Sequence, residues 1–291
     1  MRSTPYRKTM AARALALAAS LETGLQFALS LDIPPQNPAV GSRLLPDTHS
    51  KSIIHSEYHL GGTTLQLDAA LQLGVNGLSQ VWTAHPIDAP QTTLVMKIIQ
   101  PSLCRWPIDD WWNDYRDPWH LAHNEAWVYR CLVEKQGLIV PYFFGLHTIT
   151  TPSQETAWVL VLEFIPGQTV DEVVISRSMP TMREFCLLGI AAAQDLARSG
   201  WMLPYIRGPN VLLTGAPGNW TVVFIDLFEA ARLDPVDLKD SAYVETAARV
   251  QTWSFFSAFC ECTGRYFPGS GFGSGLQRHY PLLFGKDKYQ L

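Results

Sequence analysis

The sequence predicts an α+β protein in which a strand-rich part is followed by a mostly helical part. Three observations predict this class. Short β-like runs separated by turn residues begin at Thr63, apolar residues recur at helical spacing in two later segments, and hydrophobic residues make up 47% of the 291 residues while charged residues make up 16%. This composition is typical of a folded chain with sizeable cores, and it excludes a disordered protein.

Residues 1–60 are expected to form an N-terminal helix and a linker. The first stretch carries four basic residues and no acid before Glu22, and its apolar run is too short to span a membrane. It fits either a secretory or mitochondrial presequence or an amphipathic helix from about Lys8 to Leu31, ended by Pro34 and Pro35. We favour the helix in a cytoplasmic protein. Residues 32–60, rich in Pro, Ser, Asp and His, predict the linker.

Residues 61–166 are expected to form a strand-rich domain. β-like runs cover 63–74, 79–87 and 92–100, with turn residues between them. A loop rich in Trp and Asp follows, and then a helix in which Leu121, Val128 and Leu132 recur at helical spacing, with Gly137 as its stop. Two more strands are predicted over 140–150 and 156–167.

Residues 167–291 are expected to be mostly helical. A helix is predicted over 181–200, followed by a hairpin over 210–226 that turns around Gly215 to Gly218. A final helix from about Asp240 to Cys262 precedes a tail rich in glycine and aromatic residues.

Charge and cysteine usage exclude several function classes. The formal net charge is −4 and no basic block occurs, which argues against nucleic acid as the main partner. The five cysteines are scattered and form no C-x-x-C pair, and no H-E-x-x-H motif is present. We therefore expect reduced thiols in an intracellular protein and no zinc site.

A lysine inside an apolar run is the first candidate for chemistry. Lys97 stands within "LVMKIIQ", and a strand lysine that faces a core is costly unless something anionic meets it. Glu125 on the following helix is its candidate partner. The small residues of "GVNGLSQVW", from Gly74 to Trp82, would let the backbone approach a phosphate. The alternatives are a plain hairpin turn at the small residues and a solvent-facing edge strand for Lys97.

Asn210 and Asp226 are the second candidate pair. They flank the predicted hairpin, one entering its first strand and the other leaving its second, so the turn brings an amide and a carboxylate together. Oxygen ligands of this kind suit Mg²⁺ held on phosphates. Taken singly, Asn210 is explained as a turn former and Asp226 as a helix cap.

These pieces, in this order, resemble the protein kinase superfamily, in particular the divergent kinase-like proteins common in fungi. "GVNGLSQV" partly matches the G-x-G-x-x-G-x-V loop, with Asn76 and Ser79 standing where its second and third glycines belong. "VMKI" resembles the V-A-I-K strand, which gives Lys97 the phosphate-binding role and Glu125 the role of its helix partner. "IDLF" takes the place of D-F-G. The resemblance spans about Thr63 to Ala230.

The resemblance implies a set of nucleotide-binding residues. "LVLEFIPG" looks like the hinge that receives adenine through the backbone of Glu163 and Ile165, and Asn210 and Asp226 fit the metal ligands. The cofactors implied are ATP and Mg²⁺. The residues implied to bind the nucleotide are Gly74, Gly77, Ser79, Val81, Lys97, Glu125, Glu163 and Ile165.

The catalytic loop departs from the family pattern. Where members read H-x-D-[LI]-[KR]-x-x-N, "LPYIRGPN" puts Leu203 at the histidine and Tyr205 at the catalytic aspartate, while Arg207 keeps the basic position. A tyrosine with an ordinary pKa near ~10 is a poor base at neutral pH, and a lost general base costs roughly 10²–10⁴-fold in rate. No A-P-E sequence follows Asp226, which indicates either a degenerate member or a truncated gene model.

The resemblance therefore implies a bilobal protein kinase-like fold with a truncated helical C-lobe. We expect a pseudokinase, that is, a nucleotide-binding or scaffold module that acts through an unidentified protein partner and binds Mg²⁺-ATP weakly. Two alternatives stay open. One is an active phosphotransferase that acts on a protein or small molecule through a displaced acid, and the other is a non-kinase protein with chance motifs.

Overall fold

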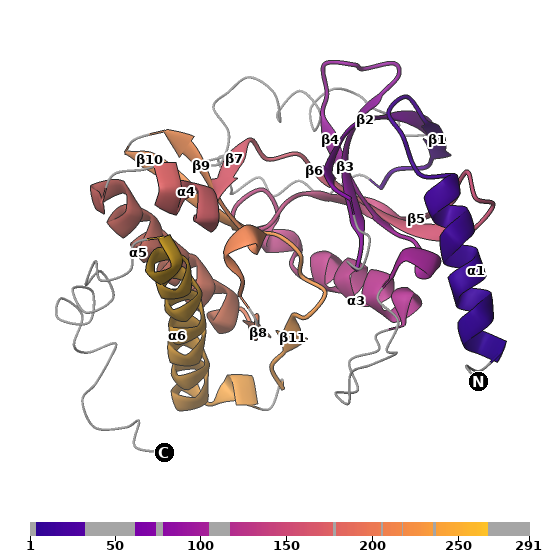
Figure 1. Cartoon of the computed structure of the whole chain (residues 1–291). Helices are drawn as coiled ribbons and strands as arrows, with labels where there is room; N and C mark the ends of the chain where they lie inside the picture. Colours follow the sequence, from indigo (N-terminus) through magenta and orange to yellow (C-terminus); the bar gives the residue numbers. More distant parts are fainter. Residues whose placement is uncertain are drawn as a thin grey trace. The chain divides into compact units, whose positions relative to one another are not determined.

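The computed structural model describes residues 4–32, 62–73, 78–104, 117–176, 179–204, 206–216, 218–234 and 237–266. The chain divides into two compact units, Met1–Ile165 (unit 1) and Pro166–Leu291 (unit 2). The described residues form a six-stranded antiparallel sheet, two smaller sheets and five α-helices (Figure 1). The predicted α+β class is confirmed. No helix among these residues is long and apolar enough to cross a membrane.

The six-stranded sheet of unit 1 contains the five predicted strands and one that was not predicted. Its order is β1-β2-β3-β4-β6-β5, and every neighbouring pair is antiparallel. The strands are β1 (Gln26–Leu29), β2 (Thr63–Gln72), β3 (Gln80–Pro86), β4 (Leu94–Ile99), β5 (Phe143–Thr150) and β6 (Thr156–Glu163). β4 thus lies inside the sheet, between β3 and β6.

The helix predicted from Lys8 to Leu31 is wrong in its second half. Helix α1 covers Thr4–Ala18, and after a turn the chain continues as β1, the edge strand beside β2. Gly24 adopts a left-handed backbone (φ +90°) at this turn and donates its N–H to the Leu67 carbonyl. Pairing with β2 buries Leu29, a gain that the local helical pattern does not reveal. The predicted linker lies almost entirely outside the described residues.

The two faces of this sheet bury different side chains. Because side chains alternate along a strand, Met96 and Ile98 share a face with Val159 and Val161, and these four belong to one apolar cluster. Lys97 projects from the opposite face. Helix α3 (Pro118–Cys131) packs against β5 and β6. The helix begins where the side chain of Asp117 accepts a hydrogen bond from the Trp119 N–H, with Pro118 at its first position.

The predicted helices and hairpin of unit 2 are present. Helix α5 (Met179–Arg198) packs against α6 (Ser241–Tyr266) and against the hairpin strand β10 (Asn219–Phe224). Strand β9 (Val211–Ala216) pairs with β10 across a turn that holds Gly215 and Gly218 at positive φ. Four short elements were not predicted: β7 (Gly167–Thr169), α4 (Val170–Ser176), β8 (Trp201–Met202) and β11 (Ala231–Arg232).

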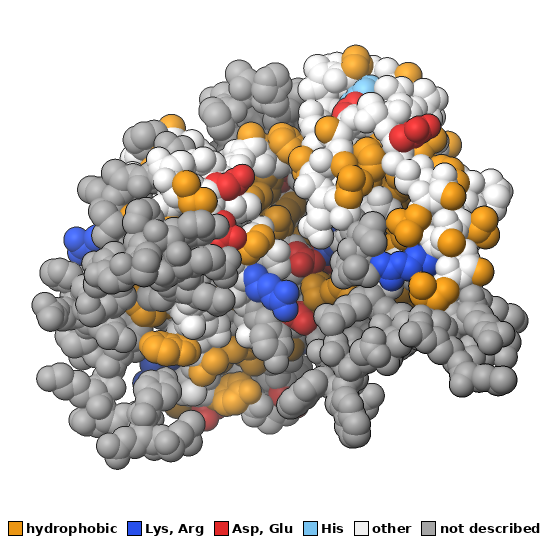
Figure 2. Space-filling model, in the orientation of Figure 1, with side chains coloured by type: hydrophobic (Ala, Val, Ile, Leu, Met, Phe, Trp, Pro, Cys, Tyr) orange, Lys and Arg blue, Asp and Glu red, His pale blue; other side chains and the backbone are white. Residues whose placement is uncertain are grey.

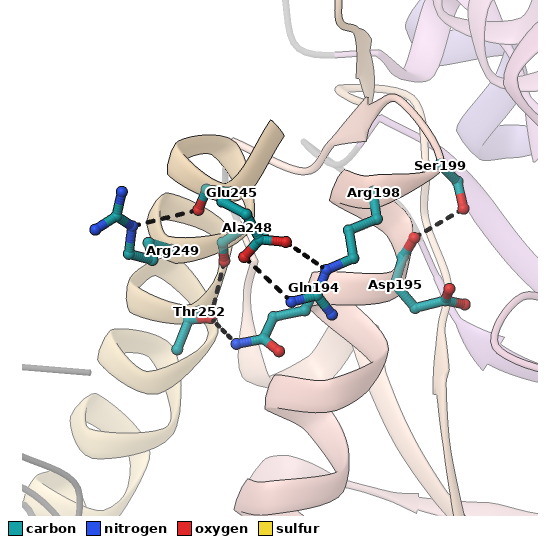
Figure 3. Close-up of polar contacts among 8 residues, drawn as sticks. All are labelled: Gln194, Asp195, Arg198, Ser199, Glu245, Ala248, Arg249 and Thr252. Atoms are coloured by element: carbon teal, nitrogen blue, oxygen red, sulfur yellow. Dashed lines mark hydrogen bonds and ion pairs between the residues drawn. The ribbon is translucent and has the colours of Figure 1, made fainter. Parts of the chain in front are cut away.

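Helices α5 and α6 meet through an aromatic core and a polar edge. The rings of Phe185, Phe255 and Phe259 are buried and lie 6.0–6.5 Å apart. At the edge, the Nε of Arg198 donates to the carboxylate of Glu245 at 3.0 Å (Figure 3). The same figure shows the amide of Gln194 on α5 donating to Thr252 on α6. Both members of the Arg198–Glu245 pair are about half exposed, so solvent screens this pair.

Candidate functional site

Lys97 and Glu125 form a buried ion pair within unit 1. The Nζ of Lys97 lies 2.6 Å from the Oε2 of Glu125, and the two residues are 7% and 0% exposed. The expected pairing is therefore present. The alternative, a lysine on the solvent face of an edge strand, is wrong because β4 is an inner strand. Both charged groups are buried away from water, so each must be stabilised by polar partners inside the protein.

Local structure explains why these two side chains meet. In the sheet register Lys97 lies between Val81 on β3 and Leu160 on β6, on the face opposite Met96 and Ile98. Glu125 lies on the buried face of α3 with Leu121 and Val128. Because the helix covers this face of the sheet, the carboxylate reaches the lysine over 28 residues of sequence.

The structure describes only part of the stretch from Gly74 to Trp82, which was expected to approach a phosphate. Gly74 and Gly77 lie outside the described residues, whereas Ser79 is buried and Val81 is half-buried. Within the same stretch, Gln80 donates its side-chain N–H to the Oε1 of Gln100 at 3.3 Å. Leu71 of β2 and Leu73, just after the strand, are exposed. Figure 2 shows hydrophobic side chains among polar atoms on the face of the molecule that it draws.

Sequence reasoning missed a polar network behind this stretch. The carboxylate of Glu155 accepts hydrogen bonds from the Ser102 N–H (2.9 Å), the Ser102 hydroxyl (2.5 Å) and the Gln100 amide (3.0 Å). Burial, and after it the charge of Glu155, raise the pKa of the nearby Cys104 thiol to about 12. This thiol donates to the carbonyl of Leu78, which belongs to the stretch from Gly74 to Trp82. The sequence holds no signal for these contacts, because their partners are up to 55 residues apart.

The predicted hinge residues lie at the end of unit 1. The backbone N–H of Glu163 donates to the carbonyl of Tyr142, and the Glu163 side chain accepts from the Tyr142 N–H at 3.1 Å. Burial, followed by the charge of Glu163, raises the pKa of the Tyr142 phenol. The Glu163 side chain therefore has a structural contact. The predicted use of the backbone at Glu163 and Ile165 for adenine stays a prediction.

Asn210 and Asp226 meet in unit 2. The side-chain N–H of Asn210 donates to the Oδ2 of Asp226 at 3.0 Å, and the Ile225 N–H donates to the Asn210 carbonyl, which closes the hairpin. Asn210 ends the short 3₁₀ helix η3 (Gly208–Asn210), directly before β9. Asp226 has φ +65°, a left-handed conformation uncommon outside glycine and concentrated at functional sites. The spacing argument correctly brought these two residues together.

An amide on α6 holds the backbone at Leu203, the first residue of the segment that resembles a catalytic loop. Gln251 is 0% exposed; it accepts from the Leu203 N–H at 2.9 Å and donates to the Leu203 carbonyl at 3.0 Å. Sequence reasoning missed this residue, which lies 48 positions away. Arg207 is exposed. Tyr205 lies outside the described residues, so the expectation about its side chain stays a prediction.

The polar groups thus form two constellations, Lys97 with Glu125 in unit 1 and Asn210 with Asp226 in unit 2. Within the described residues no three His, Cys, Asp or Glu side chains gather to hold a metal ion. The chain matches no model of a known protein family, and no curated protein matches it. The interpretation of these constellations therefore depends on their own chemistry.

The buried ion pair gives a prediction about stability. Replacing Glu125 by Gln or Ala should lower the free energy of unfolding by about 3–5 kcal/mol, because the Lys97 ammonium would be left buried without its carboxylate. The double variant Lys97→Met/Glu125→Leu should cost less than Glu125→Ala alone, because both charges are gone. Urea unfolding followed by circular dichroism measures these changes.

The exposed Arg198–Glu245 pair is the control for this experiment. Arg198→Ala should change stability far less than Glu125→Ala, and 1 M NaCl should remove what effect it has. Equal losses for Glu125→Ala and Arg198→Ala would contradict the buried, unscreened character of the Lys97–Glu125 pair.

The raised pKa of Cys104 predicts slow alkylation. At pH 9, where an ordinary thiol is about half ionised, Cys104 stays protonated and should resist iodoacetamide, whereas the exposed Cys131 should react fully. Between pH 9 and about 12 the unfolded thiol is ionised and the folded one is not, so the stability from Cys104 falls as pH rises through this window. Peptide mass spectrometry, with urea-unfolded protein as the control, checks the labelling; equal labelling of both thiols would contradict it.

Proposed function

We propose that this chain is a nucleotide-binding module with a bilobal protein kinase-like fold in which phosphoryl transfer is impaired. The observation that carries the proposal is the buried Lys97–Glu125 pair. An ion pair at such a place is commonly no more stabilising than well-packed apolar residues, so its presence favours a functional reason for the lysine. The reason proposed here is an anionic ligand, the phosphates of a nucleotide.

The geometry of unit 1 supports this role. A lysine fixed by a carboxylate presents a point charge without losing side-chain entropy on binding, which suits a phosphate ligand. The small residues from Gly74 onward precede β3, the strand beside Lys97 in the sheet. Backbone N–H groups in such a stretch are the usual complement to a phosphate-binding lysine.

The donor set of unit 2 fits Mg²⁺. Asn210 donates its amide N–H to the Asp226 carboxylate, and the pair offers an amide oxygen and a carboxylate, both oxygen ligands of the kind Mg²⁺ accepts. Two protein oxygens are few for a dedicated cation cage, but they suit an ion that takes its other ligands from phosphate and water. A Mg²⁺ ion held there would neutralise charge on the phosphate oxygens.

The expectation of impaired transfer comes from the catalytic loop. Leu203 and Tyr205 stand where the family places a histidine and an aspartate, and a neutral phenol does not accept a proton readily at neutral pH. Gln251 nonetheless holds the backbone at Leu203 by two hydrogen bonds. A loop that is held in place without a base is consistent with a binding module that acts on a protein partner.

Nucleotide binding can be measured with a fluorescent ATP analogue in the presence and absence of Mg²⁺. We expect weak, metal-enhanced binding. Asp226→Asn should remove the enhancement by Mg²⁺ and leave metal-free binding unchanged, whereas Lys97→Met should weaken both. The exposed Arg198→Ala serves as the control and should bind like the parent. Absence of binding at millimolar ATP, or binding that neither variant alters, would overturn the nucleotide role.

Phosphoryl transfer separates the impaired module from an active phosphotransferase. Transfer of labelled phosphate from ATP to generic protein and small-molecule acceptors should be negligible in the parent. The variant Tyr205→Asp should stay inactive, because Leu203 is also altered. Transfer by the parent that is lost in Lys97→Met would instead establish the active alternative. Robust transfer by Tyr205→Asp alone would refute the claim that more than one catalytic group has been lost.

A further inference from the structure

Unit 1 contains a cavity that the nucleotide proposal does not use. Its volume is about 410 Å³, and its walls come from the end of β1, the start of α3, and strands β5 and β6. The side chains that define its chemistry are Trp119, Trp158, His123, His147, Ser30 and Thr148. Lys97 and Glu125 are not among the lining residues. A cavity of this size is in the range of small-molecule sites.

Two histidines of this cavity spend their N–H groups on the backbone. The Nδ1 of His123 lies 2.8 Å from the Trp119 carbonyl, and the Nε2 of His147 lies 3.2 Å from the Phe144 carbonyl. A carbonyl oxygen only accepts hydrogen bonds, so each of these nitrogens must carry the proton. In the neutral ring, the other nitrogen of each histidine is then a lone-pair acceptor.

The aromatic and charged surroundings also favour positive charge. The indoles of Trp119 and Trp158 supply electron-rich rings, and the Trp119 ring stacks on His123 at 4.1 Å. None of the described residues that line the cavity is a Lys or an Arg. The carboxylate of Asp32 lies close by: a Cβ placed on Gly145 would be 2.9 Å from its Oδ2 and 2.6 Å from the Nε2 of His147.

We propose that this cavity binds a small organic ammonium ion that carries a planar apolar body. Imidazole lone pairs and the Ser30 and Thr148 hydroxyls accept hydrogen bonds from the ammonium, indole faces attract its charge, and the flat walls receive its body. Among the described residues of the lining, an anionic ligand would find no Lys or Arg side chain. This site is independent of the proposed nucleotide role, since it shares no lining residue with it.

Three aromatic probes of similar size test this proposal by calorimetry at pH 8. Benzylammonium should bind to the full chain, benzyl alcohol should bind at least about fivefold more weakly, and benzoate should not bind measurably. Equal binding of benzylammonium and benzyl alcohol would show that the cavity does not select positive charge, and would contradict the proposal. Tighter binding of benzoate, or binding of none of the three, would overturn the proposal.

Matched variants on one helix place the site. Trp119 is 45% exposed and Trp127 42%, and both lie on α3, but only Trp119 lines the cavity. Trp119→Leu should weaken benzylammonium binding at least about fivefold, whereas Trp127→Leu should leave it unchanged. His123→Phe keeps a planar ring and removes the acceptor, so it should weaken benzylammonium but not benzyl alcohol.

His120→Phe is the control for the histidine, because His120 is exposed and lies outside the lining. Thermal unfolding of each variant confirms that it folds. Equal effects of Trp119→Leu and Trp127→Leu, or of His123→Phe and His120→Phe, in folded proteins would overturn the placement of the ligand in this cavity.

Discussion

The buried charge of Lys97 is the constraint on which the arrangement of unit 1 depends. An ammonium on the inner face of β4 must be met by a carboxylate, and that carboxylate lies on α3. The helix therefore has to be held over this face of the sheet. Gln136 contributes to this by joining the helix to the sheet: its amide donates to the Tyr129 carbonyl and accepts from the Phe143 N–H. The ion pair thus specifies which packing of helix on sheet is acceptable, whereas apolar contacts alone would tolerate several.

Side-chain amides hold two polar contacts of unit 2. Gln251 bonds both backbone groups of Leu203, and Asn210 bonds Asp226. A buried amide satisfies irregular backbone without the desolvation penalty of an ion, so it can hold a loop rigidly at modest cost. These contacts therefore include both the residues proposed to hold Mg²⁺, Asn210 and Asp226, and the residue that holds the backbone at Leu203. In the proposed kinase-like module, Tyr205 in place of an aspartate would affect proton transfer, a role distinct from binding.

The sequence predicted those features whose signal is local or whose chemistry is costly. Strands β2 to β6 have the alternation or apolar runs that a sheet requires, and Lys97 was identified because a charge interrupts an apolar strand. The hairpin register follows from its turn, so Asn210 and Asp226 could be paired. Strand β1 was taken for helix because its four residues carry no pattern of their own. Gln251 and Glu155 were missed because their partners are 48 to 55 residues away, and no local sequence pattern marks a glutamine or glutamate that makes such a contact.

Helix α3 carries parts of both proposed sites, but on different sides. Glu125 lies on its buried side, facing Lys97. Trp119 is exposed and His123 is half-buried, and both line the cavity proposed to bind an ammonium ion. A ligand in that cavity would add to the stability of the docked helix by mass action. It would change the affinity for a nucleotide only if α3 had a second position that the two ligands favoured unequally, since a ligand with equal affinity for both states shifts nothing. The structure describes one position of α3, so we treat the two sites as independent. If an experiment contradicts one proposal, the other is unaffected.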